Sequence, residues 1–228
     1  MSSRAPATGR KTRETASSQL KDKTARAFLI TRDAVANLRE FLDDSSRMAF
    51  LTVKECEREL DQLEREIDEQ LPSAITRVGE RKARELVACL RFITDLERVG
   101  DLVWWIAQRL NDVRPKLRDK DAEALKAMAK LIISMLEEVH RGFQNGAVEA
   151  GHTVIARDHE IDELRRQVFK SQLERSNNKK HDSLESIDIL FMTQALERAG
   201  DHVTSLAEEL IHLVEGRSVR HLPKRISE

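Results

Sequence analysis

The sequence predicts an all-α protein made of two tandem, pseudo-symmetric three-helix bundles. Three observations carry this prediction: a composition that favours helices, apolar residues spaced by three and four positions, and an internal repeat. Only 4% of the residues are aromatic, tyrosine is absent, and there are 8 glycines and 4 prolines, so residues typical of strands and turns are scarce. With 228 residues, 40% of them hydrophobic, the chain is long enough to bury a core in each half.

Apolar residues at helical spacing define three segments in the first half. The first begins near residue 25 and ends at the polar interruption over 43–46. The second is expected to stop before Pro72, because a proline disfavours helix in the residue that precedes it. The third covers about 80–110. The polar stretch over 111–121 then marks the boundary between the halves.

The second half repeats the plan, with helices expected over about 122–144, 153–176 and 183–215. The short connections favour antiparallel packing of neighbouring helices. The chain is therefore divided into four parts. These are a disordered basic tail (1–24), a first bundle (25–112), a second bundle (121–216) and a basic C-terminal tail (217–228).

Two pairs of matching segments identify the halves as duplicates. Asp95-Leu-Glu-Arg-Val-Gly-Asp101 in the third predicted helix matches Ala195-Leu-Glu-Arg-Ala-Gly-Asp201 in the sixth. Glu57-Arg-Glu-Leu-Asp61 in the second matches Asp158-His-Glu-Ile-Asp162 in the fifth at nearly the same offset. Two independent matches at one spacing indicate an internal repeat.

Each matching segment carries two carboxylates one helical turn apart, beside an apolar stripe. Like charges at this spacing repel, and a glycine inside a helix costs about 1 kcal/mol relative to alanine. Gly100 and Gly200 therefore indicate the close approach of another helix or of a bound ion. Facing helices would gather four carboxylates in each half, a donor set that suits divalent and trivalent cations. The candidate metal ligands are Glu57, Asp61, Glu97, Asp101, Asp158, Asp162, Glu197 and Asp201. The alternative is that these pairs lie on solvated helix faces and form ordinary salt bridges with Arg58, Arg98 and Arg198.

The strings Leu-Glu-Arg-Val-Gly-Asp and Leu-Glu-Arg-Ala-Gly-Asp closely resemble the E(D)xxxD signatures of the PhoU family of phosphate-uptake regulators. The resemblance covers roughly 26–215 and includes the acidic element in the second helix of each half. It implies two three-helix bundles that hold multinuclear metal clusters, commonly iron or zinc, at the eight ligands named above.

The same resemblance implies a role and partners. Members of this family are not enzymes; they link a phosphate ABC transporter to a membrane sensor histidine kinase and repress the phosphate-starvation response. The expected location is the cytoplasm, in association with the inner face of the membrane through the partners, and a homodimer is possible. This chain departs from the family pattern at Trp104 and Trp105, which are expected to pack in the core or to bind a partner.

Several function classes are excluded or disfavoured. With 39 basic and 40 acidic residues the net charge is -1, so no overall field would attract nucleic acid. No phosphate-binding glycine loop and no nucleophile–base constellation is present, which argues against an enzyme. No apolar run reaches the roughly 20 residues of a membrane span.

Two other classes of protein remain as rival interpretations. A carboxylate-bridged di-iron oxidase or ferritin-like protein would use the ExxH motifs at Glu137–His140 and Glu209–His212, although neither coincides with the duplicated acidic pairs. A helical interaction module would use the acidic pairs to meet a basic partner and would bind no metal.

Overall fold

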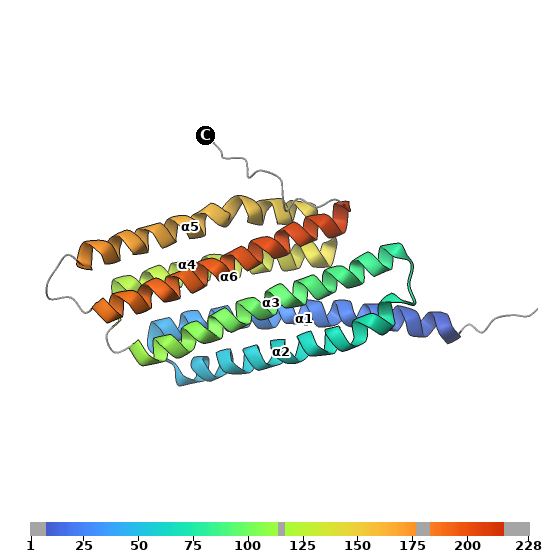
Figure 1. The fold of residues 1–228 in the computed structure, drawn as a ribbon, viewed down its shortest axis with the longest axis horizontal. Helices are drawn as coiled ribbons and strands as arrows, with labels where there is room; N and C mark the ends of the chain where they lie inside the picture. The colour runs from blue at the N-terminus through green and yellow to red at the C-terminus, as the bar shows by residue number, and fades with distance from the viewer. Residues whose placement is uncertain (1–7, 114–116, 177–182, 217–228) are drawn as a thin grey trace, which may run out of the picture.

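The computed structural model describes residues 8–113, 117–176 and 183–216, and these form six α-helices (Figure 1). The first three are α1 (Thr8–Asp44), α2 (Arg47–Ile75) and α3 (Glu80–Val113). The last three are α4 (Asp119–Asn145), α5 (Val148–Ser176) and α6 (Ser183–Glu215). The prediction of an all-α chain with three plus three helices is confirmed.

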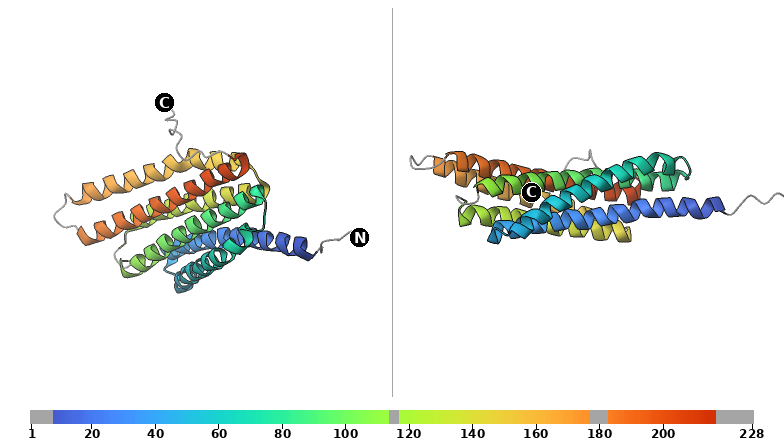
Figure 2. Two further views of the ribbon diagram at one scale, coloured as in Figure 1. Left: turned by 45° about the vertical axis from the view of Figure 1, so that its right-hand side comes forward. Right: turned by 90° about the horizontal axis from the view of Figure 1, so that it is seen from below.

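The helices lie roughly side by side and form one layered bundle from the two halves (Figure 2). Within the first half α1, α2 and α3 pack on one another, and within the second α4, α5 and α6 do the same. The halves meet where α1 packs on α4 and α3 packs on α6, so α2 and α5 lie at the outer edges (Figure 1). A continuous set of buried apolar side chains fills both halves. No helix in the described ranges contains a stretch long and apolar enough to span a bilayer.

The contact between α3 and α6 is antiparallel and is held by polar pairs as well as apolar packing. Arg91 Nη1 lies 2.9 Å from Glu209 Oε2 at one end of this contact. Arg109 Nε lies 2.8 Å from Asp188 Oδ1 at the other end. Glu209 is nearly fully buried, so its pairing with Arg91 compensates a charge that would otherwise be costly inside the protein.

The prediction of a disordered tail over residues 1–24 is wrong for residues 8–24, which form the first turns of α1. Residues 1–7 lie outside the described residues. Ser17, Leu20 and Thr24 are buried and continue the stripe that Phe28 begins. The Thr24 hydroxyl donates to the carbonyl of Leu20 at 2.9 Å, so this polar side chain is buried without an unsatisfied group.

Two lysines of this segment also have acidic partners. Lys23 Nζ lies 2.7 Å from Glu66 Oε2 on α2, and Lys21 Nζ lies 3.9 Å from Glu85 Oε2 on α3. These ion pairs connect the segment to α2 and α3.

Other predicted boundaries shift by a few residues. The break between the first two helices is confirmed, since α1 ends at Asp44 and the Ser46 hydroxyl caps α2 by accepting a hydrogen bond from Ala49 N at 3.2 Å. The predicted stop before Pro72 is wrong, because α2 continues to Ile75 and the buried Ala74 anchors its last turn. The second bundle begins at Asp119 instead of 121, and the tail predicted over 217–228 lies outside the described residues.

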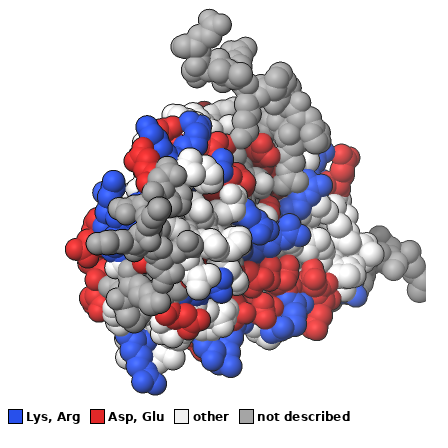
Figure 3. Space-filling view, turned by 60° about the vertical axis from the view of Figure 1, so that its left-hand side comes forward, with Lys and Arg blue, Asp and Glu red and all other residues white. Residues whose placement is uncertain are grey.

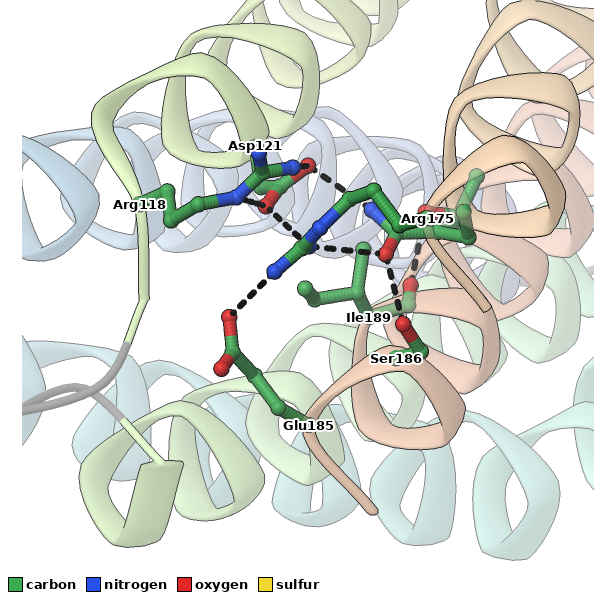
Figure 4. Close-up of polar contacts among 8 residues, drawn as sticks. Arg118, Asp121, Arg175, Glu185, Ser186 and Ile189 are labelled. Carbon is green, nitrogen blue, oxygen red and sulfur yellow. Dashed lines mark hydrogen bonds and ion pairs between the residues drawn. The ribbon is translucent and has the colours of Figure 1, made fainter. Parts of the chain in front are cut away.

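A buried polar network joins three helix ends of the second half (Figure 4). Asp121 in the first turn of α4 accepts hydrogen bonds from Arg118, from Gln172 on α5 at 2.8 Å and from Arg175 at 3.2 Å. Arg175 also pairs with Glu185 on α6, 3.6 Å away, and Gln172 accepts from Ser186 at 2.8 Å. The network therefore joins the start of α4 to the end of α5 and the start of α6.

Candidate metal centre

The eight predicted ligands fall into two clusters, each between the second and third helix of one half. In the first cluster α2 contributes Glu57 and Asp61 and α3 contributes Glu97 and Asp101. In the second, the ligands come from α5 and α6. The prediction that facing helices bring the duplicated acidic pairs near each other holds in both halves.

The repeated glycines explain this approach. A Cβ built on Gly100 would lie 2.5 Å from Leu60 Cδ1 on α2, and one built on Gly200 would lie 2.3 Å from Ile161 Cδ1 on α5. Each glycine is therefore the place where a side chain of the neighbouring helix packs directly on the backbone of the carboxylate helix. Of the two explanations open from the sequence, the close approach of a helix accounts for the glycines.

The first cluster has the geometry of a cation site. One carboxylate oxygen from each of Glu57, Asp61 and Asp101 lies within 4.8 Å of the others. Among the residues that the structure describes, this is the one group of three potential ligands with such spacing. Asp101 is exposed and the other two are half-buried, so a cation would reach the cluster from solvent.

Burial, followed by mutual repulsion, raises the pKa of several carboxyls in this cluster. The pKa of Glu97 rises from 4.5 to about 7, mainly because burial disfavours its charge and then because Asp101, Glu64 and Asp61 are negative. Burial and the charge of Asp61 also raise the pKa of Asp101. The pKa of Glu57 is raised mainly by burial and then by the charges of Asp61 and Asp101. Arg58 and Lys54 lower the pKa of Glu57 but do not cancel its rise.

In the second cluster, other protein groups compensate the negative charge of the carboxylates. Arg165 Nε on α5 lies 3.5 Å from Glu197 Oε1, and the Gln194 amide donates to the other oxygen of Glu197. Thr204 Oγ1 donates to Asp158 Oδ1 at 2.9 Å. Burial and the charge of Asp201 raise the pKa of Glu197, but Arg165 lowers it. The sequence analysis did not identify Arg165 or Glu64, although extending the repeat one residue past Leu63 and Leu164 aligns them.

Arg58, one of the arginines named in the alternative interpretation, forms its ion pair outside the first cluster. Arg58 Nη1 lies 3.8 Å from Glu55 Oε2, outside the cluster. The basic group that reaches a ligand there is Arg65, whose Nη1 lies 3.6 Å from Asp61 Oδ2 while the side chain is 61% exposed. An exposed pair of this kind is weak and leaves the inner oxygens available.

The rival di-iron motifs do not assemble. The His140 ring stacks on the Phe28 ring with their centroids 5.3 Å apart. Glu209 pairs with Arg91, and His212 lies beside the same arginine at 3.4 Å. His140 therefore packs on a core residue, and Glu209 and His212 lie at the contact between the halves.

The two tryptophans have different environments. The Trp104 ring lies 5.2 Å from the Phe50 ring and packs between α2 and α3, so the core interpretation is correct for it. Trp105 is 40% exposed and lines a groove of about 480 Å³ between α3 and α6, together with the half-buried Trp104, Asp101, Phe191 and Arg198. Because Asp101 borders this groove, the first cluster is adjacent to an apolar surface.

The raised pKa of Glu97 predicts how the stability of the protein depends on pH in the absence of metal. A carboxyl with a pKa higher in the folded than in the unfolded state stabilises the fold below pH 4.5, and this contribution is lost as the pH rises toward about 7. Since Glu97 is only partly buried, we expect Glu97→Gln to raise the free energy of unfolding at about pH 8 by about 1 kcal/mol. Urea unfolding in chelator at about pH 4 and 8 measures this. Glu69→Gln, an exposed change on α2, is the control, and an equal gain at both pH values would contradict the assignment.

Fold and site together define a class: a tandem repeat of three-helix bundles with acidic clusters on the second and third helices of each repeat and a helix-to-helix contact between repeats.

Comparison with known proteins agrees with this class. The model of the PhoU domain matches residues 24–110 and 125–210, one copy in each half. A phosphate-specific transport system accessory protein PhoU homolog from Burkholderia sp is 30% identical over 200 residues, which cover 85% of each chain. PhoU homolog 1 from Thermotoga maritima is 24% identical over 88% of each chain.

Solved structures confirm the fold. The crystal structure of PhoU from Pseudomonas aeruginosa superimposes with a TM-score of 0.83 at 19% identity, covering 90% of this chain and 99% of that one. The PhoU phosphate transport system regulatory protein from Streptococcus pneumoniae gives a TM-score of 0.80 at 19% identity, covering 91% and 99%. The chain therefore belongs to the PhoU family, a family of regulatory accessory proteins and not of enzymes.

Proposed function

We propose that this chain is an accessory regulator of phosphate uptake that binds metal ions at its acidic clusters. In this proposal it couples a phosphate ABC transporter to a sensor histidine kinase at the cytoplasmic side of the membrane and represses the phosphate-starvation response. Family membership and the names of the relatives support the role in phosphate transport. The observation that carries the metal-binding part is the group of three carboxylate oxygens within 4.8 Å of one another.

The donor set of the first cluster fits a metal ion. Glu57, Asp61 and Asp101 supply three oxygens from two helices, and Glu97, one turn before Asp101, offers a fourth. Carboxylate oxygens alone suit hard cations and are compatible with iron or zinc, as the family resemblance implies. A bound cation would supply positive charge that offsets the repulsion among these groups and would join α2 to α3. Metal binding would therefore stabilise the outer edge of the first bundle.

The groove beside the cluster is the proposed contact for a partner. Trp105 and Phe191 are 40% and 53% exposed, and exposed aromatic side chains of this kind often carry much of the energy of a protein interface. The acidic ligand Asp101 lies at one side of the groove. Bound metal would change the charge of the cluster, and this charge would act on a transporter or kinase segment bound in the groove.

Metal analysis tests the metal-binding part directly. We expect purified protein reconstituted with iron(II), zinc or manganese(II) to retain metal after exhaustive dialysis, as measured by plasma mass spectrometry. The double variant Glu97→Gln/Asp101→Asn should lose most of the metal held by the first cluster, because two of its four oxygen donors become weak amide ligands.

Asp68→Asn/Glu69→Gln is the matched control, since it removes the same two charges from exposed positions of α2. Its metal content should equal that of the wild type. A wild-type protein free of metal after reconstitution with all three ions would refute the metal-binding part of the proposal.

A second candidate function is an interaction module that works without metal. The apolar groove at Trp105 and Phe191 favours it, because partner binding there needs no cation. The two candidates differ in one measurable respect. Chelation should weaken binding to the transporter or kinase if metal sets the charge beside the groove, and should leave it unchanged if the module acts alone.

A further inference from the structure

The two acidic clusters occupy equivalent places in the repeat, but one position differs in the sign of its charge. The register that aligns Glu57 with Asp158 and Asp61 with Asp162 places Glu64 of α2 at the position of Arg165 on α5. Both residues act on the third-helix glutamate of their own half. The negative charge of Glu64 repels that of Glu97, whereas the positive charge of Arg165, 3.5 Å away, attracts that of Glu197.

In the second cluster, protein groups already occupy ligand oxygens. The Arg165 guanidinium lies 3.5 Å from one oxygen of Glu197, and the Gln194 amide donates to the other. Thr204 donates to Asp158 at 2.9 Å. The side chains of Arg165 and Glu197 are 37% and 15% exposed, so this pair is partly removed from solvent.

The first half has no counterparts of these donors. In the repeat register Thr94 stands where Gln194 stands and Trp104 stands where Thr204 stands, and the Trp104 ring packs on Phe50. The carboxylate oxygens of Glu57, Asp61 and Asp101 therefore remain within 4.8 Å of one another. Arg65, which pairs with Asp61 at 3.6 Å, is 61% exposed.

We infer that the two clusters are not equivalent metal sites: the Arg165 guanidinium takes the place of a cation in the second cluster, and the difference between Glu64 and Arg165 directs metal to the first. This inference rests on the proposed function that the chain binds metal. A guanidinium is always protonated, so it cannot yield to an incoming metal by losing a proton as a carboxyl does. It must move away, and until it does it repels the ion.

Reciprocal substitution tests this inference on the full chain. Metal-free wild type, Arg165→Glu and Glu64→Arg are titrated with zinc or manganese(II) by isothermal calorimetry. We expect wild type to bind at one high-affinity cluster, with the second roughly tenfold or more weaker. Arg165→Glu should gain a second high-affinity cluster and double the metal bound, whereas Glu64→Arg should lose the first.

Matched controls lie on the same two helices. Lys170→Glu on α5 and Glu69→Arg on α2 make the same charge changes at exposed positions that are equivalent in the repeat register. Both should bind metal as wild type does. Arg165→Gln, which removes the charge without adding a ligand, should strengthen the second cluster less than Arg165→Glu, and circular dichroism confirms that each variant is folded.

The outcomes separate the inference from the proposal beneath it. Equal, strong metal binding by both clusters of the wild type, with no effect of Arg165→Glu, overturns the inference and leaves metal binding intact. Absence of metal binding by the wild type and by Arg165→Glu overturns both. A gain of metal in Arg165→Glu that is absent in Lys170→Glu supports the assignment of Arg165 as the residue that decides between the clusters.

Discussion

Replacing Asp121 by alanine is expected to lower the free energy of unfolding by about 3–5 kcal/mol, the usual loss when one partner of a buried charged network is removed. The Asp121 side chain is only 4% exposed and accepts hydrogen bonds from Arg118, Gln172 and Arg175. Without it the Arg175 side chain, 19% exposed, loses the carboxylate that lies 3.2 Å from its Nη1 and keeps the longer ion pair with Glu185 at 3.6 Å. Urea unfolding followed by circular dichroism measures the change.

Asp119→Ala provides the control for this prediction. Asp119 lies in the same first turn of α4 but is exposed, so the two substitutions share the loss of a negative charge near the helix N-terminus, which costs about 0.3–1 kcal/mol. If Asp121→Ala costs no more than Asp119→Ala, then water reaches the network and it does not hold the helix ends together.

The second large effect is expected for Gly151→Ala on α5. A Cβ at this position would lie 2.9 Å from the carbonyl oxygen of Ala207 and 2.7 Å from Ile211 Cγ1, both on α6. Because the backbone of a packed helix cannot yield locally, α5 and α6 must move apart, and such overpacking costs about 1–3 kcal/mol. This exceeds the gain of about 1 kcal/mol that alanine brings over glycine inside a helix. Thermal and urea unfolding give the net effect.

Gly200→Ala is the informative comparison, because its Cβ would meet the terminal Cδ1 of Ile161 at 2.3 Å and not the backbone. Shortening that side chain in Gly200→Ala/Ile161→Val should recover part of the loss, a relief that the backbone contact at Gly151 does not allow. A stabilised Gly151→Ala protein would show that α5 and α6 separate without cost.

Metal binding and the stability of the fold are linked at the first cluster. Without a cation, the raised pKa of Glu97 makes the first bundle less stable as the pH rises toward 7. A bound metal would remove this penalty and add binding energy to the folded state. The outer edge formed by α2 is thus the part of the molecule whose stability should respond most to metal.

Apart from the start of α1 and the end of α2, the number of helices, their approximate bounds and the duplication could be predicted from the sequence alone. These follow from local features: the spacing of apolar residues, the polar break over 43–46 capped by Ser46, and the repeated acidic strings. The sequence also determined that Glu57, Asp61, Glu97 and Asp101 share facing helices, because the apolar stripes beside them decide which faces pack.

Only the tertiary structure decided three points. Residues 8–24 are helical because the small polar side chains of Ser17 and Thr24 are buried and Lys23 forms an ion pair with Glu66. The composition of the segment does not reveal these contacts. Trp104 packs while Trp105 remains exposed, which depends on where α2 and α6 lie around α3. Arg165 reaches Glu197 across two helices, and that pairing makes two nearly identical motifs electrostatically different. Spacing along one helix sets which residues share a face, but charge compensation depends on what the neighbouring helix presents to that face.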